Sequence, residues 1–199
     1  MPLPSRLKGQ GAGTNAPALL DADGSVLLLV DLQSRLLEAM PAGRQPALRR
    51  RLGILATAAG HLGIPVIATR QSVQSLGPLD EGLAKVLPAD TPVFDKTSFS
   101  CGRVPGILQA IGRRRRSVII GGVEAHICVL QTAFDLVPLG FSVSVVADAI
   151  CSRFDTDSEH ALHRLRQAHI GLPTTESVVY EWLRDASHPG FRDILALVR

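Results

Sequence analysis

Residues 25–30, with the sequence SVLLLV, form an uninterrupted apolar run that is followed directly by Asp31. An apolar run without polar alternation is typical of a strand whose two faces are both buried. Strands of this kind occur almost only in parallel sheets that helices cover on both sides. The segment therefore favours an α/β fold in which Asp31 lies at the carboxyl end of the first strand.

Strand-like and helix-like patterns alternate along the rest of the chain. We expect further strands at residues 65–70, 92–96, 117–122 and 141–149, and a last extended segment at residues 172–176. We expect helices at residues 47–63, 105–112, 159–171, 177–186 and 191–199, and another that has Cys128 in its first turn. Such alternation predicts a parallel sheet with helices on both faces, and right-handed crossovers then bring the strand carboxyl ends to one edge.

Three local patterns carry narrower predictions. Residues 71–91 predict a long loop, and the segment TDSE at residues 156–159 fits a capping box that starts a helix. The four arginines at residues 113–116 follow a helical pattern, so we expect them to cap its carboxyl end and stay in solvent. A nucleic-acid role for this run is the alternative.

The composition favours one domain. The chain has 199 residues, of which 46% are hydrophobic, and this is enough for one substantial core. We expect residues 1–24, rich in Gly, Pro and Ala, to form an irregular arm, and residues 25–199 to form the domain. The net charge of +3, from 21 basic and 18 acidic residues, is too balanced to indicate a nucleic-acid partner.

The cysteines and the N-terminal segment indicate a cytoplasmic protein. Cys101, Cys128 and Cys151 are odd in number and widely spaced, and no Cys/His cluster resembles a zinc site. The first 24 residues lack the apolar core of a signal peptide, and no apolar run is long enough to span a bilayer. We therefore expect reduced thiols and no membrane partner.

Three polar groups lie where this architecture places a site. Asp31 ends the first strand, Lys96 ends the third, and Cys128 lies in the first turn of the helix after the fourth. A carboxylate beside a thiol can act as its general base, and an ammonium group can hold the thiolate by its charge. Taken singly, the alternatives are a helix-capping Asp, a solvated Lys and a packed Cys.

Longer motifs surround these three residues. In chain order they are LLLVDLQ at residues 27–33, VFDKTSFS at 93–100, GVEAHICVLQTAFDL at 122–136, VVADAICSR at 145–153 and TTESVVYEWLRDASHPGFRDI at 174–194. With this set, the sequence from residue 25 onward resembles the isochorismatase-like cysteine hydrolase superfamily, and within it the isochorismatase domain-containing branch.

The resemblance implies a Rossmann-like three-layer sandwich with a mainly parallel six-stranded sheet. It implies that Cys128 is a nucleophile, Asp31 its base, and Lys96 the charge that stabilises the thiolate and the transition state. It also implies a cis peptide between Val123 and Glu124, which would aim the amides of Glu124 and Cys128 into an oxyanion hole. The expected reaction is hydrolysis of a small amide or related acyl compound through a thioester.

The resemblance also sets expectations about metals and partners. Nicotinamidases of this superfamily carry an Asp and several His residues at the exit of the second strand, whereas residues 68–78 here read ATRQSVQSLGP. We therefore expect no metal and no cofactor. Cys128 favours acyl chemistry over the vinyl-ether cleavage of true isochorismatases. Because family members commonly form dimers or larger oligomers, we expect a homo-oligomer that acts on a small molecule.

Several other residues have two interpretations each. Gln33 and Gln71 either line the substrate pocket, as the resemblance implies, or bind a loop backbone. His126 is interpreted as a surface or subunit contact, because residues two apart on a helix do not face one another. Cys101 could approach the site, but a packed thiol is preferred, and Cys151 is interpreted as structural.

Two other functions stay open. The chain could be a catalytically idle interaction module, or a redox sensor that needs only a reactive Cys128. The intact set of Asp31, Lys96 and Cys128 favours the enzyme. An activated Cys128 is expected to react with iodoacetamide well below the ordinary thiol pKa.

Overall fold

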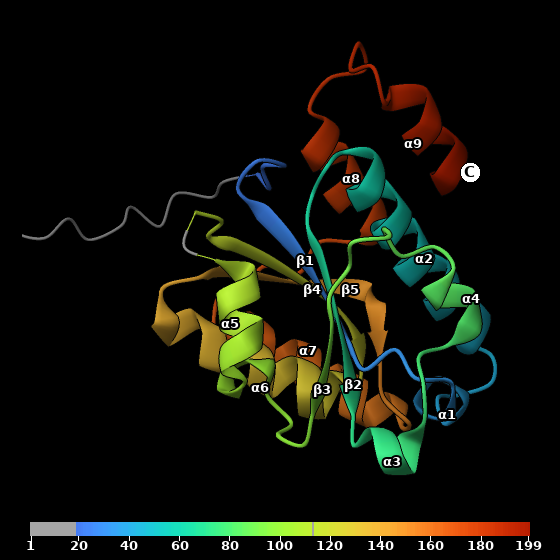
Figure 1. Ribbon diagram of the computed structural model, residues 1–199, viewed down its shortest axis with the longest axis vertical. Coiled ribbons are helices and arrows are strands. Elements are labelled where there is room, and N and C mark those ends of the chain that lie inside the picture. Colours follow the sequence, from blue (N-terminus) through green and yellow to red (C-terminus); the bar gives the residue numbers. More distant parts are fainter. Residues whose placement is uncertain (1–18, 113) are drawn as a thin grey trace, which may run out of the picture.

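The structure is a computed structural model, and it describes residues 19–112 and 114–199. Its centre is one parallel sheet with the strand order β3-β2-β1-β4-β5 (Figure 1). The strands are β1 (Ser25–Val30), β2 (Val66–Gln71), β3 (Val93–Lys96), β4 (Ser117–Val123) and β5 (Ser142–Cys151). Every residue of β1 is buried, and β2 and β4 pair with it in parallel. The expected burial of the first strand on both faces is confirmed.

Among the described residues the sheet has five strands, where the resemblance implied six. The segment expected as the sixth strand makes a single parallel bridge to β5, and two N–H groups of β5 donate to the carbonyls of Gly171 and Pro173. A parallel ladder needs donors in return. Pro173 has no N–H, and the N–H of Thr175 donates to Oδ1 of Asp148 instead. The pairing therefore stops at one bridge.

Helices cover both faces of the sheet (Figure 1). One face carries α1 (Ser34–Glu38), α2 (Gln45–His61), α4 (Glu81–Ala84), α8 (Thr175–Leu183) and α9 (Phe191–Val198). The other face carries α5 (Pro105–Ile111), α6 (Leu130–Leu136) and α7 (Asp155–Gln167). Leu27 and Leu29 of β1 pack into the first core, while Leu28 between them packs into the second. None of the helices in the described part of the chain is long and apolar enough to cross a membrane.

Residues 71–91 are not a simple loop. They contain α3 (Val73–Leu76) and α4, which are four residues long each. The side chain of Asp80 caps α4, because Oδ1 accepts a hydrogen bond from the N–H of Leu83 at 3.2 Å. Helices this short show no apolar periodicity in the sequence, which explains why the pattern predicted a loop.

The predicted capping box is wrong. α7 begins at Asp155, with Phe154 as its N-cap residue and without a side-chain cap, so Thr156 and Glu159 lie inside the helix. Asp155 and Asp157 lie in the first turn, where negative charge stabilises the N-terminus of a helix. The helix start is thus supported by charge instead of by a capping hydroxyl.

Arg115 anchors the entry to β1 instead of capping a helix. Its Nη1 donates to the carbonyl oxygens of Ala22, Asp23 and Ser25 at 3.3, 3.0 and 3.0 Å. This corrects the expectation for Arg115 alone, because Arg114 and Arg116 are exposed to solvent as expected. Arg113 lies outside the described residues.

The described end of the N-terminal arm lies against α8. The N–H of Leu20 donates to Oε2 of Glu181 at 2.7 Å, and Arg184 donates to the carbonyls of Leu19 and Leu20. Residues 1–18 of the expected arm lie outside the described residues.

Candidate functional site

Asp31, Lys96 and Cys128 meet at the carboxyl edge of the sheet. Asp31 follows β1, and Lys96 ends β3, two strands away. The Lys96 side chain reaches past β2, so that Nζ lies 2.8 Å from Oδ2 of Asp31, and both side chains are fully buried. Cys128 follows β4 on the other side of β1, and the charges of Asp31 and Lys96 both act on the pKa of its thiol. The structure therefore brings together three side chains that are far apart in the sequence.

The Lys96 ammonium group is enclosed by oxygen atoms. Its Nζ donates to Oε1 of Gln71 at 2.6 Å and to Oδ2 of Asp31 at 2.8 Å. The carbonyl oxygens of Phe99 and Ser98 accept at 3.1 and 3.3 Å. An ammonium group has three donors, so all of them are used within the chain. Lys96 therefore acts on its surroundings through its charge.

Thr69 on β2 fixes the carboxylate of Asp31. The Thr69 hydroxyl donates to Oδ1 of Asp31 at 2.7 Å and accepts from the backbone N–H of Asp31 at 3.0 Å. Asp31 itself has a φ of 55°, a left-handed conformation that residues other than glycine rarely adopt. Sequence reasoning missed Thr69. Its signal was the alternation of β2, which places Thr69 on the same side of the strand as Gln71.

Cys128 lies in a π-helical turn, η2 (Ala125–Val129), that leads from β4 into α6. The sequence predicted an ordinary helix start at this point. The N–H of Val129 instead donates to the carbonyl of Glu124 five residues back, at 3.2 Å. The peptide bond between Val123 and Glu124 is cis, at the position that the resemblance implied. Cys128 is 6% exposed, whereas the side chains of Asp31 and Lys96 are fully buried.

Gly122 lets β4 approach β1 closely before this turn. Its φ is +125°, and a Cβ added there would lie 2.1 Å from the carbonyl oxygen of Val30. Only glycine fits such a contact without moving the backbone. Gly122 therefore sets the distance between the strand end that carries Asp31 and the strand end that leads to Cys128.

The pKa of the Cys128 thiol is raised. Burial is the largest cause and the charge of Asp31 is the second, while the charge of Lys96 acts in the opposite direction. The resting thiol therefore keeps its proton and faces a carboxylate that can accept it. This direction is opposite to the one expected for an activated thiolate, whose reactivity stays a prediction.

The amide of Gln33 holds two loops in place. Its Nε2 donates to the carbonyls of Gln71 and Gly77 at 3.0 and 2.8 Å, and its Oε1 accepts from the N–H of Gln71 at 2.7 Å. Gln71 in turn binds Lys96 through Oε1 and the carbonyl of Thr97 through Nε2. Of the two interpretations of these glutamines, the bonds favour the one in which they hold the backbone and Lys96.

The side chain of Glu124 binds Arg153 at the exit of β5. Its Oε2 accepts from the backbone N–H and from Nε of Arg153, each at 3.1 Å. The carboxylate is buried, whereas half of the Arg153 side chain is exposed. Glu124 was expected to contribute through its backbone, and this ion pair adds a role for its side chain.

His126 is held inside the chain. Its Nδ1 lies 2.8 Å from Oγ of Ser152, and its Nε2 lies 3.7 Å from Oδ2 of Asp157. These contacts join the turn that carries Cys128 to the end of β5 and to α7. They add an intramolecular role for His126, whose side chain stays 27% exposed, and the surface or subunit contact remains a prediction.

Cys101 lies beside the site. It is fully buried, and its pKa is raised to about 11, chiefly by burial, with the charges of Lys96 and Asp31 acting in opposite directions. Its backbone N–H donates to Oγ1 of Thr132 at 2.9 Å. Cys151 is buried as well, at the end of β5. Both interpretations as packed thiols agree with this burial.

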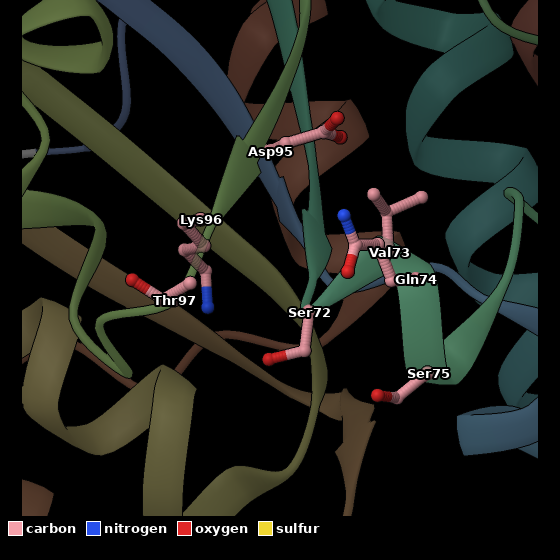
Figure 2. A pocket seen from close by; sticks show the side chains of 7 residues that line it. All are labelled: Ser72, Val73, Gln74, Ser75, Asp95, Lys96 and Thr97. Atoms are coloured by element: carbon pink, nitrogen blue, oxygen red, sulfur yellow. The ribbon is translucent and has the colours of Figure 1, made fainter.

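A cavity of about 500 Å³ opens beside the end of β3 (Figure 2). Residues 72–75 and residues 95–97 face each other across it. The lining residues are Ser72, Val73, Gln74, Ser75, Asp95, Lys96 and Thr97. Hydroxyl and amide groups make up most of the polar lining. Asp31 and Cys128 do not line the cavity, which adjoins the buried trio through Lys96.

The side chains of the described residues do not form a metal site. Within residues 19–112 and 114–199, no group of three or more His, Cys, Asp or Glu side chains is placed to hold a metal ion.

Comparison with known proteins places this chain among relatives of similar length. A family model described as Isochorismatase domain matches residues 25–177. Isochorismatase domain-containing protein 2 of Danio rerio is 38% identical over 188 residues, which cover 90% of this chain and 89% of that protein.

Solved structures share the fold over nearly the whole chain. A structure described as MAR1 ribonuclease from Caenorhabditis elegans has a TM-score of 0.86 and 34% identity, and covers 91% of this chain and 92% of its own. An octameric hydrolase of unknown specificity from Escherichia coli has a TM-score of 0.80 and 26% identity, with coverages of 93% and 89%. YcaC from Pseudomonas aeruginosa, described with hexane-2,5-diol and covalent acrylamide, has a TM-score of 0.83 and 26% identity, with coverages of 90% and 91%.

Proposed function

The chain belongs to the isochorismatase family, and from this premise we propose that it is a metal-independent cysteine hydrolase that cleaves a small amide or related acyl compound through a thioester. Membership of the family supports a hydrolase role. The observation that carries the finer proposal is the buried ion pair of Lys96 and Asp31, at 2.8 Å, against the thiol of Cys128. A nucleophile, a base and a fixed positive charge are the groups that acyl transfer to sulfur requires.

The first step is attack of sulfur on the substrate carbonyl. As the S–C bond forms, the thiol proton passes to the carboxylate of Asp31. The raised pKa of the thiol makes this transfer unfavourable in the resting site, so it accompanies the attack and does not precede it. Lys96 stays beside Asp31 throughout and supports the developing negative charge on sulfur and oxygen by its own charge.

The second step is collapse of the tetrahedral intermediate. The backbone N–H groups of Glu124, which directly precedes the turn η2, and of Cys128, which lies within it, are the proposed oxyanion donors. Loss of one such donor costs about 3 kcal/mol in comparable sites. Asp31 returns its proton to the leaving nitrogen, the C–N bond breaks, and an acyl thioester remains on Cys128. Water, deprotonated by Asp31, then releases the acid and restores the thiol.

One structural neighbour supports a reactive nucleophile in this fold. The description of the Pseudomonas aeruginosa protein names covalent acrylamide, which is an electrophilic amide. We extend this reactivity to Cys128 of the present chain as part of the proposal.

RNA cleavage is the second candidate, because the Caenorhabditis elegans neighbour is described as a ribonuclease. The most basic described helix is α2, and two of its arginines are bound to acidic partners. Arg49 donates to Asp80 at 3.1 Å, and Arg51 binds Asp148. These ion pairs reduce the positive charge that this helix offers to a phosphate backbone, so amide hydrolysis is preferred.

We also infer that the protein works in the cytoplasm as a homo-oligomer. The described hydrolase of Escherichia coli is octameric, which supports assembly but does not fix the number of subunits here. Analytical ultracentrifugation of the purified protein measures that number, and a monomer would contradict this part of the proposal.

The deciding experiment measures ammonia release from a panel of small amides, with a short RNA as an additional substrate. Wild type is expected to hydrolyse at least one amide, and Cys128→Ala and Asp31→Asn are expected to lose that activity. Cys151→Ser is the matched control, because it changes another buried thiol away from the trio. Full turnover by Cys128→Ala would overturn the covalent route, and cleavage of RNA alone would favour the second candidate.

A further inference from the structure

We propose that this site selects uncharged substrates and discriminates against those that carry a carboxylate. The inference rests on the proposed function and adds the class of compound. It follows from how the charged side chains at the carboxyl edge of the sheet are paired.

The buried cation of the site has no free donor for an anionic substrate. Lys96 is fully buried, lies 2.8 Å from Asp31, and gives its remaining hydrogen bonds to Gln71 and to backbone carbonyls. Its charge is balanced by Asp31. A substrate carboxylate at Cys128 would therefore meet a neutral thiol and an ion pair with no net charge.

Two arginines near the ends of strands in this sheet are also paired with carboxylates. Arg153, at the exit of β5, binds the buried carboxylate of Glu124 at 3.1 Å. Arg70, near the end of β2, binds both carboxylate oxygens of Asp95 at 2.7 and 3.1 Å. Each pair leaves little positive charge to attract an anion.

Two further pairs and one single cation also lie near this edge. Arg103 binds Asp135 at 2.9 Å, and His126 faces Asp157 at 3.7 Å. Arg35 of α1 has no acidic partner among the described ion pairs, but it donates to the carbonyl of Ser75 and is exposed. Solvent and salt screen an exposed charge strongly.

The adjoining cavity has the same neutral character. Its polar lining consists mainly of Ser72, Gln74, Ser75 and Thr97. Its one carboxylate, Asp95, is paired with Arg70, and its one cation, Lys96, is paired with Asp31. Hydroxyl and amide groups satisfy a neutral amide or alcohol by both donating and accepting. A carboxylate bound there would lose water without gaining a cation, which is unfavourable.

The test compares two alkylating reagents that differ in charge. Iodoacetamide is neutral and iodoacetate is an anion, and both alkylate the same sulfur. Peptide mass mapping identifies the alkylation of Cys128. The rate constant for iodoacetamide is divided by that for iodoacetate, and this ratio is normalised by the same ratio measured with glutathione. We expect the normalised ratio to favour iodoacetamide by about tenfold or more, because the carboxylate of iodoacetate would lose water at this site without gaining a cation.

Two charge variants test whether the ion pairs cause this selectivity. Glu124→Gln keeps an acceptor for Arg153 but removes its counter-charge. The normalised ratio is therefore expected to fall several-fold toward one, which is its value for glutathione. Glu81→Gln is the matched control. It makes the same change of net charge and frees Lys85 on α4, at the opposite face of the sheet from η2.

The outcomes separate the inference from the function on which it rests. A normalised ratio near one in wild type, or an equal effect of both variants, would overturn the selection of uncharged substrates and leave the nucleophile intact. If neither reagent modifies Cys128 in folded protein even at alkaline pH, with Cys128→Ala as the reference, the nucleophile itself is overturned and the inference with it.

Discussion

The hydroxyl of Thr69 both donates to Oδ1 of Asp31 at 2.7 Å and accepts from the N–H of Asp31 at 3.0 Å. One hydroxyl therefore fixes the carboxylate and the left-handed backbone of the same residue. The other carboxylate oxygen, Oδ2, binds Lys96. With both oxygens held, the orientation of Asp31 toward Cys128 is set before any substrate arrives, which is the condition for efficient proton transfer in a closed site.

Thr69→Val is expected to lower kcat on the amide that the panel identifies by about ten- to a hundredfold, with little change in KM, because it misplaces the base and not the substrate. Thr69→Ser keeps the hydroxyl and is expected to restore most of the activity. Thr132→Val is the control, since it removes another buried hydroxyl that does not bind Asp31. Equal losses in Thr69→Val and Thr132→Val would show that the effect is general destabilisation.

The ion pair of Lys96 and Asp31 is expected to matter for folding as well as for catalysis. Lys96→Met leaves a fully buried carboxylate without its counter-charge, which costs about 3–5 kcal/mol of unfolding free energy. The double variant Lys96→Met with Asp31→Asn removes both charges and should regain part of that loss. Urea unfolding of the three proteins measures this, and a double variant as unstable as the single one would show that the charge is not the cause.

Asp31→Asn is expected to lower the pKa of Cys128, although it abolishes turnover. The charge of Asp31 is the second cause that raises this pKa, after burial, and Lys96 then acts on the thiol unopposed. In wild type the alkylation rate should keep rising with pH beyond the ordinary thiol range, while in Asp31→Asn it should level off at lower pH. Rate profiles with iodoacetamide from neutral to alkaline pH compare the two proteins. A wild-type profile that levels off near neutral pH would contradict the raised pKa.

Gly122→Ala is expected to destabilise the protein by about 3 kcal/mol or more, because the backbone has a positive φ and the new Cβ would overlap the carbonyl of Val30. Gly43→Ala is the matched control, since its added Cβ meets nothing within 4 Å. Thermal unfolding measures both variants. Equal stability of the two would show that β4 can shift away from β1 at no cost.

Much of the architecture could be predicted because it depends on local periodicity. The continuous apolar run of residues 25–30 and the alternation of strands and helices predict a parallel sheet covered on both faces, and the structure confirms this. The positions of Asp31, Lys96 and Cys128 at strand ends predict a common edge. The predictions from sequence were wrong where the backbone departs from periodicity. Examples are the four-residue helices α3 and α4 and the single bridge in the segment that contains Pro173.

By itself, the sequence determined which side chains end the strands and therefore which edge of the sheet holds the candidate site. Only the tertiary structure decided how those side chains are bound: the Thr69 hydroxyl on Asp31, the four oxygen atoms around Lys96, and the raised pKa of Cys128. The physical reason is that hydrogen bonding and desolvation depend on atoms from distant segments that meet within about 3 Å and exclude water. Periodicity along the chain shows which face a residue occupies, whereas its partners across that face are set by packing.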